Sequence, residues 1–299
     1  MVAKAASVAP AGSVAAARSP GAPTVPLLAA NYSQALMRRL LADGGAVDVI
    51  KVSEFDRPEF WDDYAAARSH KPLILHGLGH GARPGNPGFR AVFGPAALRA
   101  ALAATASAYV SAHLEHFSME AETLSPAAFL EALTADVAAV REAAGMPVHL
   151  ENGHSYRPVR GRPRNPDFIS DPSYIAAALA ATGSRLLLDL AHVRIAAWHR
   201  GQRPSAYLSA LPLDLVDEVH VVGTATVDGE LRDKHVEMDE DDYAALAFVL
   251  ERAPVNLVTL EYGGVSGSVL DARSNPEALA RQLGRLRQVL AGARGAQGR

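Results

Sequence analysis

The residues most able to do chemistry concentrate in the stretch 185–235. It opens with the apolar run RLLLDL, which carries Asp189 and is followed closely by His192. Further along, the segments VDEVHVVG and DKHVEM add His220, Asp233 and His235. Imidazole and carboxylate groups of this kind bind divalent metal ions. The stretch therefore predicts part of a metal site.

Composition narrows the kind of site. The 299-residue chain has no cysteine, which excludes disulfides and thiolate ligands, so any metal must be held by histidine and carboxylate. The net charge of −3 gives no overall basic field that would attract nucleic acid or an anionic membrane. Because no stretch is long and apolar enough to span a bilayer, we expect a soluble, cytoplasmic protein without a membrane partner.

The elements that must position these residues follow a regular alternation of apolar runs and helical patterns. The predicted strands are 25–31, 47–52, 72–77, 108–113, 147–152, 185–190, 218–223 and 256–264. The predicted helices are 33–43, 57–68, 95–105, 126–144, 174–181, 241–251 and 276–290. Val-, Ile- and Leu-rich runs between helices are typical of a parallel sheet that is covered on its outer face. Eight such units predict an α/β fold, a single-domain (β/α)8 TIM barrel.

We place the barrel domain at residues 25–292. The segment 1–24 is rich in Ala, Pro, Ser and Gly and lacks the continuous apolar block of a signal peptide, so we expect a disordered leader. The segment 293–299 is expected to be a disordered tail.

Six of the predicted strands end on a residue type that binds metals. These residues are His76, His113, Glu151, Asp189, His220 and Glu261. In a barrel the carboxyl ends of all strands meet at one mouth. We expect His192, Asp233 and His235 on loops at the same mouth, which gives nine candidate ligands. One divalent ion takes about four to six ligands, so nine suit two or three ions bridged by carboxylates.

Each candidate also has a structural interpretation. Asp189 could cap a following helix, Glu261 could pair with an arginine, and a lone histidine at a strand end is often simply hydrogen-bonded. The set favours the metal site, because five of the 11 histidines fall at mouth positions. The other histidines are weaker candidates: we expect His80, His116, His154 and His199 to face solvent on loops, expect His70 to be structural, and leave His149 unassigned.

Other enzyme chemistries lack their motifs. The sequence has no Gly-rich dinucleotide fingerprint, no Walker loop, no G-x-S-x-G elbow and no cysteine nucleophile. A two-carboxylate glycosidase would leave the histidines unexplained.

The motifs together resemble a known family, the multinuclear non-heme iron-dependent oxidative enzymes (MNIO), which are TIM barrels. The segments that carry the resemblance are HGLGHG, VSAHL, LEN, LLLDLAHVRIAAWHRG, YLSALPLDLVDEVHVVGTA and DKH. The resemblance covers most of the chain, from Leu27 to Leu290. It implies two or three iron ions, O2 as cosubstrate, and oxidation of a side chain, often Cys, in a ribosomally made precursor peptide. It also implies a partner protein that presents the peptide, and the nine mouth residues as ligands.

The chain departs from the pattern of this family at three places. His192 stands where many members have Asn, and Tyr262 and Gly263 stand where an Arg-Asp pair is common. Lys51 occupies a position on the second strand where an acid is frequent.

Other functions share the same order of ligands. It is similar to that of the endonuclease IV family, whose three zinc ions serve DNA cleavage at abasic sites, and a metal-dependent sugar isomerase belongs to the same barrel class. A barrel that stores metal without catalysis is a non-enzymatic alternative. The acidic charge balance disfavours a nucleic-acid partner. The one concentrated basic segment carries Arg157, Arg160, Arg162 and Arg164, and we interpret it as a recognition surface for an acidic peptide or partner.

Overall fold

A computed structural model describes residues 25–53, 61–79, 81–117, 123–155, 165–262 and 275–297. The predicted leader, His80 and the arginine segment 157–164 lie outside the described residues, so the expectations for them stay predictions.

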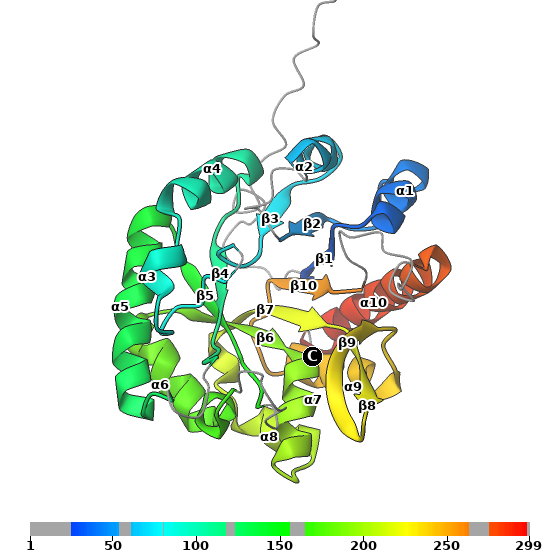
Figure 1. Cartoon of the computed structure of the whole chain (residues 1–299). Helices are drawn as coiled ribbons and strands as arrows, with labels where there is room; N and C mark the ends of the chain where they lie inside the picture. Colours follow the sequence, from blue (N-terminus) through cyan, green and yellow to red (C-terminus); the bar gives the residue numbers. More distant parts are fainter. Residues whose placement is uncertain are drawn as a thin grey trace, which may run out of the picture.

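Parallel strands form a closed barrel at the centre of the fold, as Figure 1 shows. Around the barrel the order is β1-β10-β7-β6-β5-β4-β3-β2. The strand bounds are β1 Leu27–Asn31, β2 Val49–Val52, β3 Leu73–Leu75, β4 Val110–His113, β5 Val148–Glu151, β6 Arg185–Asp189, β7 Val216–Val221 and β10 Leu257–Leu260. Each of these strands overlaps a predicted strand for most of its length. The predicted TIM barrel is therefore confirmed.

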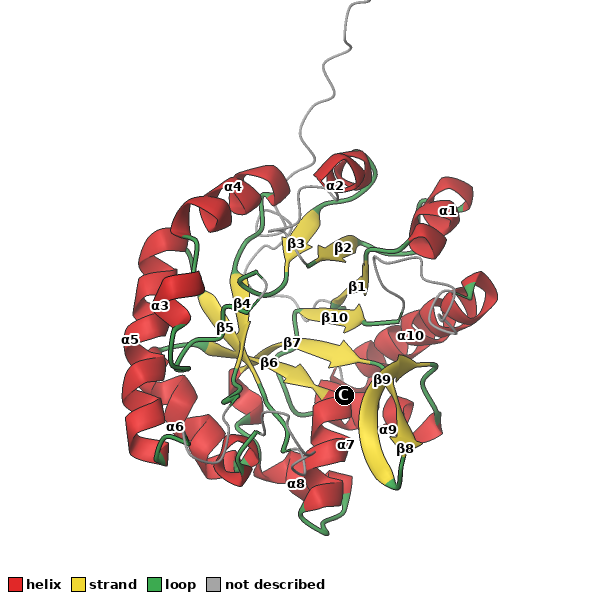
Figure 2. Ribbon diagram, viewed as in Figure 1, coloured by secondary structure: helices red, strands yellow, loops and turns green. Residues whose placement is uncertain are grey.

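Helices surround the barrel on its outside (Figure 2). They are α1 Gln34–Ala42, α2 Trp61–Arg68, α3 Phe89–Val92, α4 Pro95–Thr105, α5 Pro126–Ala144, α6 Pro172–Thr182, α7 Leu190–His199, α8 Pro204–Ala210, α9 Glu240–Leu250 and α10 Pro276–Gln297. The last helix continues past its predicted end at residue 290 into the segment expected to be a tail. None of the described helices combines the length and apolar character needed to cross a membrane.

Alternation along the strands divides the core in two. Residues such as Leu28 and Ile50 point outward and pack with the helices in the large hydrophobic cluster. A second, small cluster consists of Ala29, Val49, Ile74, Tyr109 and Leu257. Because these residues alternate with the outward-facing ones, they fill the interior of the barrel toward the amino ends of its strands.

Two parts of the structure differ from the sequence prediction. Residues 190–199 form helix α7 directly after β6, where we expected a loop. Residues 223–236 form a two-stranded antiparallel hairpin, β8 Gly223–Val227 and β9 Glu230–Val236, which lies apart from the barrel sheet. The turn between these strands contains Asp228 and Gly229, a sequence typical of hairpins, so the signal for this element was present.

Candidate metal centre

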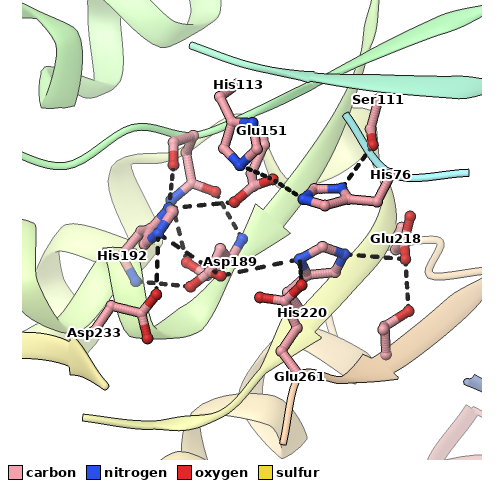
Figure 3. Close-up of polar contacts among 12 residues, drawn as sticks. His76, Ser111, His113, Glu151, Asp189, His192, Glu218, His220, Asp233 and Glu261 are labelled. Carbon is pink, nitrogen blue, oxygen red and sulfur yellow. Dashed lines mark hydrogen bonds and ion pairs between the residues drawn. The ribbon is translucent and has the colours of Figure 1, made fainter. Parts of the chain in front are cut away.

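The nine predicted ligands gather at the carboxyl ends of the barrel strands, and we call them the mouth cluster. Its members are His76, His113, Glu151, Asp189, His192, His220, Asp233, His235 and Glu261. Figure 3 shows most of them pointing toward one another from different strands. The barrel therefore brings together side chains that are far apart in the sequence.

His192 reaches the mouth cluster from a helix rather than from the predicted loop. Asp189 is the N-cap of α7, and its Oδ1 accepts a hydrogen bond of 2.8 Å from the backbone N–H of His192. Asp189 thus caps the helix, as the structural interpretation proposed, while its Oδ2 still faces the cluster. The helix is buried on nearly all sides, so it lacks the polar face by which a surface helix is recognised in a sequence.

Asp233 and His235 come from strand β9, which corrects the expectation of a loop. The pairing of β8 and β9 shifts register between Gly223 and Thr224. His235 adopts a left-handed backbone with φ of 49°, which is strained for a residue with a side chain. Its Nε2 lies 3.1 Å from Asp233 Oδ2. The bulge therefore holds these two side chains together at the mouth.

Three overlapping groups in the mouth cluster have the geometry to hold a metal ion. They are His76, His113 and Glu151; Glu151, Asp189 and His192; and His76, His220 and Glu261. Within each group the ligand atoms lie within 4.8 Å of one another. Because His76 and Glu151 each belong to two groups, the groups form one continuous site.

Glu151 lies between two of these groups. Its Oε2 is 3.5 Å from His76 Nε2 and 3.4 Å from His113 Nε2, and its Oε1 is 3.5 Å from His192 Nδ1. Glu151 therefore connects two of the ligand groups through its two oxygens.

Asp189 and Glu261 each belong to one of the three groups. Asp189 Oδ2 lies 3.9 Å from His192 Nε2 and 4.0 Å from His220 Nδ1. Glu261 Oε1 lies 3.2 Å from His220 Nδ1, and Asp233 Oδ2 lies 3.9 Å from His192 Nε2.

Several buried polar atoms of the mouth cluster have no hydrogen-bond partner among the described residues. They are His113 Nδ1, Glu151 Oε2, Asp189 Oδ2 and His220 Nδ1. Buried polar atoms are normally paired, and groups that are not call for a ligand such as an ion. Nitrogen and oxygen donors without thiolate suit iron, zinc or manganese. The residues present therefore fit a multinuclear metal centre.

The carboxylates set the charge state of the histidines. Burial alone would lower the pKa of His192, but the carboxylates of Asp189, Glu151 and Asp233 outweigh it and raise this pKa to about 9. In the same way Glu261 contributes to raising the pKa of His220 to about 10. Burial raises the pKa of Asp189 to about 7. The cluster thus attracts positive charge, whether from protons or from metal ions.

Hydrogen bonds on the far side of the rings fix three of the histidines. Nδ1 of His76 lies 2.8 Å from Ser111 Oγ, and Nδ1 of His192 lies 2.8 Å from the Asn152 carbonyl. Nδ1 of His235 lies 2.8 Å from the carbonyl of Glu261. When Nδ1 donates in this way, Nε2 is left as the metal-binding nitrogen.

A second polar group, which the sequence analysis missed, lies deeper in the barrel. We call it the floor cluster: Lys51, Tyr109, His149, Glu218 and Thr259. Lys51 and Glu218 form an ion pair of 2.5 Å, and both are almost completely buried. Glu218 Oε1 also accepts from the hydroxyl of Thr259 at 2.6 Å, and Oε2 accepts from that of Tyr109 at 2.5 Å. The ring of Tyr109 stacks on His149 with centroids 3.9 Å apart.

Strand alternation explains why this second layer exists. His149, Glu218 and Thr259 each stand two residues before a member of the mouth cluster, which lies on the same strand or directly after it. Side chains two apart share one face, so these residues point into the barrel one layer below the mouth. This relation was available in the sequence once the ligands were assigned.

Two of the remaining histidines, His116 and His154, are less exposed than predicted. His116 is fully buried, and its Nε2 accepts a hydrogen bond of 2.9 Å from the backbone N–H of Leu124. His154 is also buried and packs on His192 with ring centroids 4.3 Å apart. The expectation that these two face solvent is wrong, because one ring accepts a backbone hydrogen bond and the other packs on a member of the mouth cluster.

The mouth cluster opens into a cavity of about 420 Å³. Seven of its members line the cavity, while Asp189 and His220 lie outside this lining. The rim includes Phe117 and two arginines, Arg83 and Arg232. Arg83 is paired with Glu115 at 3.0 Å. An open cavity lined by polar and aromatic side chains gives a ligand access to the mouth cluster from one side.

Comparison with known proteins identifies the sequence family. The family model described as "RiPP precursor modification enzyme MbnB/TglH/ChrH" matches residues 56–264, more than half of the chain. A UPF0276 protein of Chromobacterium violaceum is 28% identical over 234 residues, which are 75% of this chain and 80% of that protein. Another, of Paraburkholderia phytofirmans, is 30% identical over 166 residues, 53% and 52% of the two chains. The match to a UPF0276 protein of Caulobacter vibrioides spans about a third of that relative, at 31% identity.

Solved structures share the fold. Mannonate dehydratase from Streptococcus suis superposes with a TM-score of 0.64 at 10% identity, covering 92% of this chain and 95% of that one. A D-tagatose 3-epimerase-like protein gives 0.62 at 13% identity, covering 89% and 98%. Endonuclease IV from Thermus thermophilus gives 0.54 at 16% identity, covering 89% and 100%. At these identities the likeness concerns the barrel alone.

Proposed function

Because the chain belongs to the family of RiPP precursor modification enzymes described as MbnB/TglH/ChrH, we propose that it oxidises a side chain of a ribosomally made precursor peptide, with Cys as the leading candidate. The proposed reaction uses O2 and two or three iron ions held by the mouth cluster. The observation that carries this proposal is the overlap of three ligand groups through His76 and Glu151.

The proposed division of labour follows from the geometry. When bound, iron would supply the electrons and exchangeable coordination positions that reactions with O2 require. The chain holds the ligands with anchored histidine rings and leaves the cluster open to the cavity on one side. A peptide side chain would enter from this side, while Asp189 and His220 lie behind the cavity lining, where they serve the metals alone.

The proposed partners are the precursor peptide and a protein that presents it. The described rim contributes Arg83 and Arg232 to peptide binding, and Arg157 to Arg164 add a predicted recognition segment outside the described residues. We propose a cytoplasmic location, where such a peptide is synthesised. Reversing the charges at 157–164 should weaken peptide or partner binding, and unchanged binding would contradict a role of this segment.

Elemental analysis of protein purified without oxygen tests the central claim. We expect more than one iron per chain, and O2 consumption that depends on a matched peptide. Short peptides encoded by the genes neighbouring this one are the substrates to try first. Zinc in place of iron, with cleavage of abasic DNA and no O2 uptake, would overturn the proposal in favour of a nuclease. Bound iron without any turnover would instead support metal storage.

A further inference from the structure

Arg83 lines the cavity of the mouth cluster and uses only part of its hydrogen-bonding capacity. Its Nε donates to Glu115 Oε2 at 3.0 Å, and its side chain makes no other hydrogen bond among the described residues. The N–H groups of its two terminal nitrogens, Nη1 and Nη2, therefore have no acceptor in that part of the chain. The side chain of Arg83 is 26% exposed. A guanidinium with unused donors thus stands at the cavity.

Neighbouring groups hold this guanidinium in place. The ring of Phe117 has its centroid 5.9 Å from Arg83 Cζ, within the range of a cation–π contact. Asn86 ties the two segments together, because its Oδ1 accepts from the backbone N–H of Phe117 at 2.8 Å. Its Nδ2 donates to the carbonyls of Glu115 and Arg83, at 2.6 and 3.3 Å. The fold therefore fixes Arg83 before a ligand arrives, which lowers the entropic cost of binding one.

The turn that carries Arg83 is packed directly on helix α5. Gly85 has a φ of 84°, and a Cβ at this position would lie 2.9 Å from the ring of Phe129. The backbone N–H of Gly85 also donates to Asp136 Oδ2 at 3.0 Å. This packing sets the point from which the Arg83 side chain reaches the cavity.

A carboxylate is the group of a peptide that fits the free end of this guanidinium. Nη1 and Nη2 form a planar fork that matches the two oxygens of a carboxylate. The cavity of about 420 Å³ is the size of a small-molecule site. A carboxylate bound at Arg83 and a side chain at the mouth cluster would therefore belong to the same residue or to neighbouring ones.

We propose that Arg83 binds a carboxylate of the peptide substrate through Nη1 and Nη2, and so selects peptides in which the reacting side chain lies beside a carboxylate. This inference rests on the proposed function and adds a chemical requirement on its substrate. The carboxylate has two sources in a peptide, namely an Asp or Glu side chain next to the reacting residue, and the free carboxyl terminus.

Calorimetric titration with two pairs of synthetic peptides tests this requirement on protein purified without oxygen. The first pair is acetyl-Asp-Cys-Asp-amide and its neutral twin acetyl-Asn-Cys-Asn-amide. The second pair is acetyl-Ala-Cys-Ala with a free carboxyl terminus and the same peptide as an amide. In at least one pair the acidic peptide should bind about tenfold more tightly or better, because hydrogen bonds between charged groups are strong. The pair that shows this gain identifies the source of the carboxylate.

Two variants of Arg83 assign the gain to its guanidinium. Arg83→Gln should abolish the gain, and Arg83→Lys should lose most of it, because an ammonium keeps the charge without the planar fork. Arg90→Gln is the matched control and should keep the gain. Arg90 also pairs through Nε with a carboxylate, that of Asp136 at 2.6 Å, but it does not line the cavity. Melting temperatures near that of the wild type show that the variants are folded.

Equal binding of the acidic and neutral peptides in both pairs would overturn the proposal, as would a gain that persists in Arg83→Gln. Absence of binding for all four peptides has the same consequence. O2 uptake is measured separately, with the matched peptide. A preference for carboxylates that depends on Arg83, in a protein that takes up no O2, would leave this binding site standing and overturn the proposed oxidation instead.

Discussion

The mouth cluster and the floor cluster are adjacent layers of buried ionisable side chains, yet they differ in how these charges are paired. In the floor, both oxygens of Glu218 accept hydrogen bonds, and Lys51 balances its charge. In the mouth, Glu151 and Asp189 each keep a buried oxygen without a hydrogen-bond partner among the described residues. The difference teaches that the carboxylate of the floor is fully paired as folded, whereas the carboxylates of the mouth are arranged for added positive charge.

The two layers should therefore contribute to stability with opposite signs. A buried carboxylate that is paired and hydrogen-bonded tolerates burial, and removing its partner is costly. Carboxylates that face one another repel. Burial is the main cause that raises the pKa of Asp189 to about 7, and the neighbouring carboxylates add to this rise. Residues selected for binding a ligand often reduce the stability of the empty protein. Four substitutions probe this contrast.

The largest effect is expected for Glu151→Ala. Glu151 belongs to two of the three ligand groups, so its loss should remove most of the bound metal and all peptide-dependent O2 consumption. Elemental analysis after gel filtration measures the metal content. Glu115→Gln is the control, because Glu115 lines the same cavity and pairs with Arg83 without belonging to any ligand group. Full metal content in E151A would show that Glu151 is structural.

Lys51→Met probes the floor. It should destabilise the metal-free protein by about 3–5 kcal/mol, because it leaves the buried carboxylate of Glu218 without a counter-charge. Denaturant unfolding measures this loss. Adding Glu218→Gln to this variant should recover most of the stability, since the unpaired charge is then gone. If Lys51→Met alone were as stable as the wild type, the ion pair would not stabilise the floor cluster.

Asp189→Asn probes the mouth with a change that keeps the helix cap. Asparagine accepts the backbone N–H of His192 as aspartate does, so α7 should stay intact. Without metal at pH 8, where Asp189 is ionised, we expect a gain in stability of about 1 kcal/mol from the loss of a repelled buried charge. With metal bound, the variant should instead be less stable than the wild type. A loss of stability in the metal-free variant would contradict the assigned contrast between the layers.

The sequence predicted the barrel and the side chains that meet at its mouth because both rest on short patterns. Apolar runs that end on His, Asp or Glu gave the strands, and the convergence of strand ends in a barrel gathered His76 with Glu261 without any further information. The floor cluster was missed for the opposite reason. Lys51 was noted as a departure from the family pattern, but its partner is 167 residues away in the sequence, and a pairing across the barrel is set by register and tertiary packing.

The hairpin and α7 were missed for local reasons. Helix α7 is apolar on nearly every side, so its period is hidden, and a run after a strand was interpreted as a loop. In β9 the four consecutive polar residues 232–235 interrupt the alternation on which strand prediction depends. Asp233 and His235 were nevertheless assigned correctly to the mouth, because their place in the chain, after β7, was sufficient.

The smallest effect on stability is expected at Arg232, a cation that contrasts with Lys51. Arg232 lines the cavity, is half-buried, and has no ion-pair partner among the described residues. Replacing this side chain at the rim should change the unfolding free energy by less than about 0.5 kcal/mol.

If Arg232 meets an anionic group of the peptide, Arg232→Gln should raise KM about tenfold and leave kcat and metal content unchanged, because one charge-assisted contact is worth about 1.5–3 kcal/mol. Steady-state kinetics with the matched peptide measures both constants, and Lys234→Gln, an exposed cation two residues along β9, is the control. An unchanged KM would show that the rim binds its peptide without this charge.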